Sequence, residues 1–207
     1  MTVDRDQCVH IVDDDEALRD SLAWMLGTTG YRVRTYASAQ AFLAAGHEGM
    51  TGCVLLDVRM PAMSGLELFD ALRRQRFALP AIFVTGHGDV PMAVAALKKG
   101  AFDFIEKPFG ERDIVRVIER ALLHERAGRA QRDAVLEGRR RMESLTQRER
   151  EVLDLVVVGR LNKQIGDELG ISIKTVEVHR ARVMEKMAAT SLAELVSLVL
   201  QLKAPPA

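Results

Sequence analysis

Residues 54–68, VLLDVRMPAMSGLEL, contain a short apolar run, an aspartate and the start of a helix. The first three residues are typical of a strand buried on both faces, and Asp57 follows where that strand leaves the sheet. Pro61 cannot continue the strand because it has no amide donor. Ser64 and Glu67 have the spacing of a capping box, which starts a helix. The stretch therefore predicts a strand, a loop and a helix.

This alternation of strand and helix recurs throughout residues 8–123. Four other apolar runs predict strands, at 8–13, 31–36, 81–85 and 102–106. Each connection is long enough to require parallel pairing. We therefore predict an α/β, flavodoxin-like doubly wound sheet of five parallel strands in the order 2-1-3-4-5.

Polar residues stand where four of these strands end. The carboxyl ends of parallel strands meet at one edge of the sheet, so Asp13, Asp57, Thr85 and Lys107 should lie close together. An aspartate after a strand is most often only a turn or cap residue, but the joint occurrence favours chemistry. Clustered carboxylates need a cation, and Mg²⁺ takes oxygen ligands and bridges to phosphate. Asp57 is then a candidate nucleophile for forming an aspartyl phosphate, with Lys107 and Thr85 contacting phosphoryl oxygens.

Residues 8–123 resemble the receiver domain of a bacterial two-component response regulator. The resemblance rests on the acidic pair after the first strand, the D-x-R-M-P-x-M-S-G block at Asp57, Thr85, and the step from Lys107 to Pro108. These motifs span the whole predicted sheet.

The resemblance implies roles for several of these residues. Asp13, Asp14 and Asp57 would hold Mg²⁺ together with the backbone carbonyl of Arg59, and the Lys107-Pro108 bond would be cis. Thr85 and Phe104 would form a switch in which Phe104 repacks when the Thr85 hydroxyl moves. A plain core aromatic remains the alternative role for Phe104. Asp15 and Glu16 are interpreted as helix caps.

The segment 124–144 holds ten charged residues and no proline. Gly128 and Gly138 each weaken a helix by about 1 kcal/mol relative to alanine. A flexible connector and a solvated helix both fit this composition, and we expect the helix. The predicted organisation is a receiver domain at 1–123, a helical linker at 124–144 and a DNA-binding domain at 145–207.

Residues 145–202 predict an all-α domain of four helices. A capping box from Thr146 to Glu149 starts the first helix, and a glycine turn at Gly170 separates two short helices as in a helix-turn-helix. The region resembles the LuxR-type DNA-binding domain in L-T-x-R-E-x-E-V-L, N-K-x-I and K-T-V-E-V-H-R. With the preceding receiver, the chain is similar to the FixJ subfamily of the NarL/FixJ group.

The third of these helices should read DNA, and basic residues around it should contact phosphates. The domain holds nine basic and eight acidic residues, so one copy should bind weakly and two copies should pair on a two-fold site. Candidates for that pairing in the last helix are Leu192, Leu195, Val196 and Val199, although most of them must pack the domain's own core. The candidate DNA-binding residues are Lys163, Lys174, Thr175, Val178, His179, Arg180, Arg182 and Lys186.

The implied partners are a sensor histidine kinase and double-stranded promoter DNA, with RNA polymerase as a further candidate. Phosphorylation of Asp57 would drive homodimerisation through the fourth helix and fifth strand. The protein would not be an enzyme beyond assisting its own phosphorylation and dephosphorylation. Residues 1–12 lack the apolar length of a signal peptide, and no run suits a membrane span. Two cysteines in strand-like runs suit a reducing compartment, so we expect a cytoplasmic protein without membrane partners.

Three other functions were weighed. A haloacid-dehalogenase-like phosphatase requires a second aspartate two residues after its nucleophile, and position 59 is arginine. A flavin-binding module requires hydroxyl groups after the first strand, and this chain has acids there, which repel phosphate. A DNA-binding regulator that is never phosphorylated is disfavoured by the complete set of acids, hydroxyl and lysine.

Overall fold

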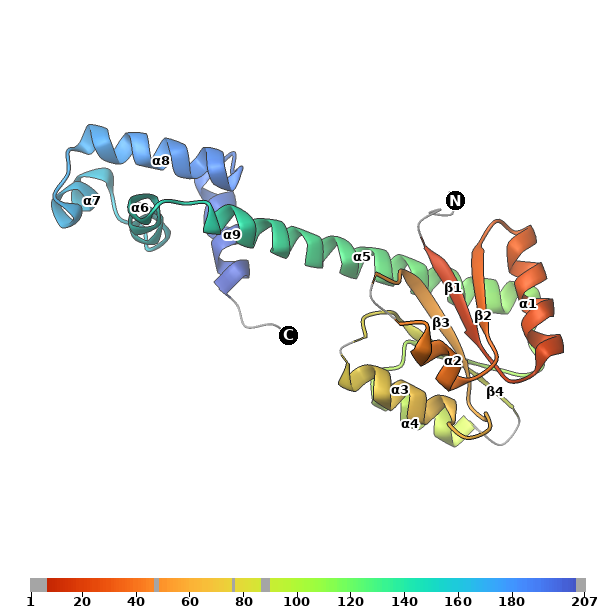
Figure 1. Cartoon of the computed structure of the whole chain (residues 1–207). Helices are drawn as coiled ribbons and strands as arrows, with labels where there is room; N and C mark the ends of the chain where they lie inside the picture. Colours follow the sequence, from red (N-terminus) through yellow and green to blue (C-terminus); the bar gives the residue numbers. More distant parts are fainter. Residues whose placement is uncertain (1–6, 47–48, 76, 87–89, 204–207) are drawn as a thin grey trace. The chain divides into compact units, whose positions relative to one another are not determined.

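The computed structural model describes residues 7–46, 49–75, 77–86 and 90–203 (Figure 1). The chain divides into two compact units, Met1–Gly128 and Arg129–Ala207. Among the described residues, no helix has both the length and the apolar character needed to span a bilayer.

The first unit is built on one five-stranded sheet. Its strands are β1 (Cys8–Val12), β2 (Arg32–Tyr36), β3 (Gly52–Asp57), β4 (Ala81–Thr85) and β5 (Asp103–Glu106). They lie in the order β2-β1-β3-β4-β5, and every neighbouring pair is parallel. The sheet confirms the predicted fold class and strand order.

Helices cover both faces of this sheet. They are α1 (Glu16–Thr28), α2 (Ala39–Ala44), α3 (Gly65–Arg74), α4 (Val90–Lys98) and the first part of α5 (Glu111–Glu143). Apolar side chains of α1 and α5 form one core cluster with the sheet, and those of α2, α3 and α4 form the other. The predicted capping box starts α3, because Ser64 Oγ accepts from the Glu67 amide and Glu67 accepts from the Ser64 amide.

The second unit is all helical. It contains α6 (Gln147–Val157), α7 (Asn162–Leu169), α8 (Ile173–Met187) and α9 (Leu192–Lys203) around one apolar core. Gly170 ends α7 with a positive φ of 65°, which the turn into α8 requires. A Cβ at Gly166 would lie 2.8 Å from the Ile171 carbonyl oxygen, so glycine allows this turn to pack tightly against α7.

Helix α5 covers Glu111–Glu143, and its residues from Arg129 onward belong to the second unit. Its last turns pack against α9, where a Cβ at Gly138 would lie 3.0 Å from Leu202 Cδ2 and 3.5 Å from Leu198 Cδ1. Arg141 Nη1 also donates to the Met187 carbonyl at 3.4 Å. The end of α5 is therefore part of the packed core of the second unit.

Candidate functional site

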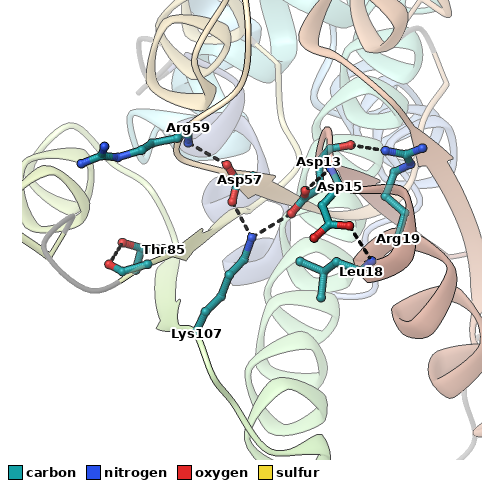
Figure 2. Close-up of polar contacts among 9 residues, drawn as sticks. Asp13, Asp15, Leu18, Arg19, Asp57, Arg59, Thr85 and Lys107 are labelled. Carbon is teal, nitrogen blue, oxygen red and sulfur yellow. Dashed lines mark hydrogen bonds and ion pairs between the residues drawn. The ribbon is translucent and has the colours of Figure 1, made fainter.

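The first acid of the site is Asp13, directly after β1. Its side chain is only 3% exposed, and its Oδ1 accepts a hydrogen bond from the Asp15 amide at 2.9 Å (Figure 2). Asp15 is the N-cap of α1, as predicted, because its Oδ1 accepts from the Leu18 amide at 3.2 Å. Asp14 between them is exposed. In this acidic run, the Asp13 carboxylate is thus buried, Asp14 is exposed and Asp15 caps α1.

Asp57 is the last residue of β3 and is 7% exposed. Its Oδ2 accepts from the Arg59 amide at 2.7 Å, which fixes the carboxylate. Gly65 packs against the same backbone: a Cβ there would overlap the Asp57 carbonyl oxygen, and the Gly65 amide donates to Val58 at 3.2 Å. The glycine of the M-S-G motif therefore lets α3 start immediately beside the acid.

Lys107 joins the two buried acids. Its Nζ lies 2.6 Å from Asp57 Oδ1 and 3.0 Å from Asp13 Oδ2, and its side chain is 29% exposed (Figure 2). Residues at the carboxyl ends of β1, β3 and β5 thus meet at one edge of the sheet, as the parallel topology predicts. The peptide bond from Lys107 to Pro108 is cis.

The oxygen donors of the site fit a divalent cation in part. Two carboxylates already converge on one positive group, the Lys107 ammonium, and hard oxygen donors suit Mg²⁺. Among the described residues, no three acidic, histidine or cysteine side chains gather closely enough to form a metal site unaided. Asp13 and Asp57 therefore fit a cation, whereas ligation by the exposed Asp14 and by the Arg59 carbonyl stays a prediction.

Burial and charge set the protonation of these groups. Burial raises the pKa of Asp57 above its ordinary value, and the neighbouring Asp13 charge adds to this, while hydrogen bonding and charge from Lys107 oppose it. Burial disfavours the charged form of Lys107, but its hydrogen bonds to Asp57 and Asp13 outweigh that effect and raise its pKa. The lysine therefore stays protonated between the acids.

Thr85 ends β4 and is completely buried. The register pairs Asp57 with Val84, so Thr85 lies at the same sheet edge as the acid. Its Oγ1 donates to the Gly86 carbonyl at 3.2 Å, and Figure 2 shows it apart from the carboxylates. Phe104 pairs with Phe83 in the sheet and packs against the core cluster of α2, α3 and α4. The two residues of the predicted switch thus occupy adjacent strands.

The sequence motifs do not identify Arg19 as part of the site. Its Nη1 donates to the backbone carbonyl of Asp13 at 2.8 Å, from the end of the first turn of α1 (Figure 2). The sequence feature that would have indicated this role is a basic residue near the start of a helix that follows a strand ending in acidic residues. The arginine lies one turn after the cap, Asp15, on the side of the helix that faces Asp13.

In the second unit, part of the predicted DNA-binding set is open to solvent. Val178 is 46% exposed, although it is apolar and central in α8. Thr175 is half-buried, with its Oγ1 2.8 Å from Ser172 Oγ at the start of α8. The exposed basic members are Lys163, Lys174 and Arg182.

Other members of that set have partners inside the unit. Arg180 Nη1 donates to Asn162 Oδ1 at 3.0 Å, which ties α8 to α7. Lys186 Nζ lies 2.6 Å from Glu149 Oε2, and the Glu149 side chain is 2% exposed. The hydrogen bond from Lys186, followed by that from the Thr146 amide, lowers the pKa of Glu149 to about 2. His179 Nδ1 is buried and has no hydrogen-bond partner among the described residues.

The four residues considered for domain pairing in α9 differ in accessibility. Leu195 and Val199 are 1% and 0% exposed and belong to the unit's own core, so they are not available to a partner. Leu192 is 46% exposed, and Val196 is half-buried. Leu200, which was not selected, is 58% exposed because it lies one turn beyond Val196 on the outer face.

Two family models match the chain. Residues 9–119 match the response regulator receiver domain, and residues 143–199 match the bacterial regulatory proteins of the luxR family. The chain belongs to the two-component response regulators that carry a LuxR-type DNA-binding domain. Membership of these families implies a histidine kinase partner and DNA binding.

Individual relatives agree over nearly the whole chain. The transcriptional regulatory protein FixJ of Rhizobium meliloti (strain 1021) is 51% identical, with 94% of this chain and 96% of the relative covered. The tetrathionate response regulatory protein TtrR of Salmonella typhimurium is 44% identical, with 91% and 89% covered. A low-resolution structure of the response regulator StyR matches with a TM-score of 0.86 at 42% identity, covering 94% and 98%. The protein is thus a FixJ/TtrR-like transcription regulator.

Proposed function

We propose that Asp57 accepts a phosphoryl group from a sensor histidine kinase, and that this controls dimerisation and promoter binding. The observation that carries the proposal is the convergence of Asp57 and Asp13 on the Lys107 ammonium, at 2.6 and 3.0 Å. The buried carboxylate supplies the nucleophile, and the protonated lysine beside it supplies a positive charge for the incoming phosphoryl oxygens.

In the proposed transfer, one Asp57 carboxylate oxygen forms a bond to phosphorus while the bond from phosphorus to the phosphohistidine nitrogen breaks. The electron pair of that bond leaves with the imidazole, which takes a proton from solvent. Lys107 then contacts the phosphoryl oxygens, and the Thr85 hydroxyl turns from the Gly86 carbonyl to donate to one of them. Mg²⁺, held by Asp13, Asp14, Asp57 and the Arg59 carbonyl, would neutralise charge on the same oxygens.

The switch would follow from that turn of Thr85. Movement of the hydroxyl opens space at the end of β4, and Phe104 on the adjacent strand repacks into it. The surface formed by α4 and β5 then pairs with a second copy. Residues 1–123, 124–144 and 145–207 act as receiver, helical linker and DNA-binding domain, in a cytoplasmic protein that can also contact RNA polymerase.

The proposed DNA interface centres on the exposed face of α8. Lys174 and Arg182 contact base edges or phosphates there, and Val178 offers an apolar contact to a thymine methyl group. Lys163 at the start of α7 contacts a phosphate. Thr175 and His179 lie on the same helix and complete this surface. We assign Arg180 and Lys186 a positioning role, since their ion pair and hydrogen bonds lie within the unit.

The test compares Asp57→Asn with Asp70→Asn in the full-length chain. Asp70 is a half-exposed aspartate of α3 that pairs with Lys99 on the surface at 2.8 Å. With acetyl phosphate and Mg²⁺, the wild type and Asp70→Asn should each gain one phosphoryl group in intact mass and form dimers. Asp57→Asn should do neither while keeping its circular dichroism. Equal phosphorylation or equal dimerisation of Asp57→Asn would refute the proposal.

A further inference from the structure

Arg19 holds the loop that carries the acidic residues of the site. Its guanidinium reaches back from α1 and donates to the Asp13 backbone carbonyl at 2.8 Å (Figure 2). The side chain is half-buried, and the Arg19 amide donates to the Asp15 carbonyl at 3.0 Å. The same residue thus contacts the loop through both its side chain and its backbone.

The Asp13 carbonyl lies just beyond the last strand pairing of β1. The Asp13 amide donates to the Tyr36 carbonyl at 3.2 Å, and after that point the chain leaves the sheet. A backbone carbonyl that turns away from the sheet needs a hydrogen-bond donor in place of the lost strand pairing. The Arg19 guanidinium supplies both the donor and a positive charge.

Holding this carbonyl also restrains the backbone from which the Asp13 side chain extends. The peptide group between Asp13 and Asp14 is planar, so a hydrogen bond to its oxygen restrains the Cα atoms of both residues, which lie in the same plane. From that backbone, Asp13 Oδ2 points to Lys107 at 3.0 Å, and Oδ1 accepts from the Asp15 amide at 2.9 Å. The exposed Asp14 supplies the amide nitrogen of the same peptide group, so its backbone is restrained by the same contact.

We propose that Arg19 is a positioning residue for the phosphorylation site, acting through the Asp13–Asp14 peptide without touching Asp57. The inference rests on the proposed phosphorylation of Asp57. Arg19 sets where the first acids present their oxygens to a divalent cation, and so how well that cation binds beside the Asp57 carboxylate. Arginine suits the role because its rigid planar donors direct a hydrogen bond, whereas lysine offers a flexible point charge.

Three variants of the full-length chain test this role. Arg19→Gln removes the charge and shortens the donor, and Arg19→Lys keeps the charge but loses the fixed geometry. Arg74→Gln is the matched control, because Arg74 is an exposed arginine at the end of α3. Mg²⁺ affinity is measured by calorimetric titration without any phosphodonor. Phosphorylation rates with acetyl phosphate are measured separately as a function of donor concentration.

Arg19→Gln should weaken Mg²⁺ binding and lower the saturated phosphorylation rate, each by roughly tenfold, the lower end of the roughly 10–100-fold cost of losing a group that orients a metal ligand. The KM for acetyl phosphate should change little, and the variant should keep its fold without Mg²⁺. Arg19→Lys should recover only part of the loss, and Arg74→Gln should match the wild type.

Two outcomes would overturn the positioning role. Wild-type Mg²⁺ affinity in Arg19→Gln would show that the contact is dispensable, and complete rescue by Arg19→Lys would show that only charge matters. Failure of the proposed function has a different signature, since the wild-type chain itself would then take up neither Mg²⁺ nor a phosphoryl group. Measuring Mg²⁺ binding and phosphorylation of the wild type therefore distinguishes failure of the positioning role from failure of the proposed function.

Discussion

Lys186 and Lys174 lie near opposite ends of α8, and replacing each by methionine should affect a different property of the protein. Lys186 Nζ lies 2.6 Å from Glu149 Oε2 and 3.3 Å from the Ser144 carbonyl, so it joins the end of α8 to the start of α6. Lys174 is exposed in the first turn of α8. We expect Lys186→Met to destabilise the second unit and Lys174→Met to weaken DNA binding.

The magnitude for Lys186 follows from its partner. The pKa of Glu149 falls from 4.5 to about 2, and at 1.36 kcal/mol per unit this sets a ceiling of about 3 kcal/mol on the stabilisation. The Lys186 side chain is 34% exposed, so solvent screens the pair, and the Thr146 amide still bonds to Glu149 after substitution. We therefore expect a loss of ~1–2 kcal/mol.

Native-state hydrogen exchange of the full-length chain reports this loss at the buried amides of Val152 and Val183. DNA binding is followed by fluorescence anisotropy on a mixed-sequence duplex over a range of salt concentrations. Lys174→Met should reduce the slope of log affinity against log salt by about 0.9, as for one lost phosphate contact. Lys186→Met should leave that slope unchanged. Unaltered protection together with a reduced slope in Lys186→Met would refute the structural role.

Three further predictions concern single positions. The pKa of Glu149 is lowered in the folded state, so the stabilisation from its charge is present above pH 4.5 and is lost as the pH falls toward about 2. Acid titration followed by circular dichroism should therefore show a smaller loss of stability over this pH range in Glu149→Gln than in the wild type. Leu161 is the N-cap of α7 without a side-chain cap bond, so Leu161→Ser should stabilise the unit by ~0.5–1 kcal/mol in calorimetry. Gly65→Ala should slow phosphorylation roughly tenfold by displacing Asp57, whereas Gly27→Ala, which meets open space, should not.

The convergence of the acids and the lysine could be predicted because it follows from topology. Each predicted strand was short, apolar and local in the sequence, and parallel pairing places all of their carboxyl ends at one edge. Asp57 and Lys107 therefore had to meet once the strand order was right. The hydrogen bond of Thr85 to Gly86 could not be predicted in this way, because a hydroxyl rotor is set by local contacts.

The role of Lys186 was hidden for the opposite reason. Its partner, Glu149, is 37 positions earlier in another helix, and helical periodicity gives the face of a residue without identifying the residue opposite. The packing role of Gly138 was hidden in a similar way. The glycine weakens the helix by its local propensity, yet it allows α5 to pack closely against Leu198 and Leu202, so tertiary packing compensates for that cost.

The proposed phosphorylation site combines two restrained carboxylates with a lysine ammonium that can move. Asp13 and Asp57 are buried, and amide hydrogen bonds from Asp15 and Arg59 hold their carboxylates in place. Lys107 is partly exposed on a flexible stem, so its ammonium can leave the carboxylates for phosphoryl oxygens without any backbone movement. Because burial raises the pKa of Asp57 even with this lysine beside it, one ammonium does not fully offset the cost of burying the charged carboxylate. A divalent cation bound at the proposed site would add positive charge beside this carboxylate while Lys107 contacts the phosphoryl group.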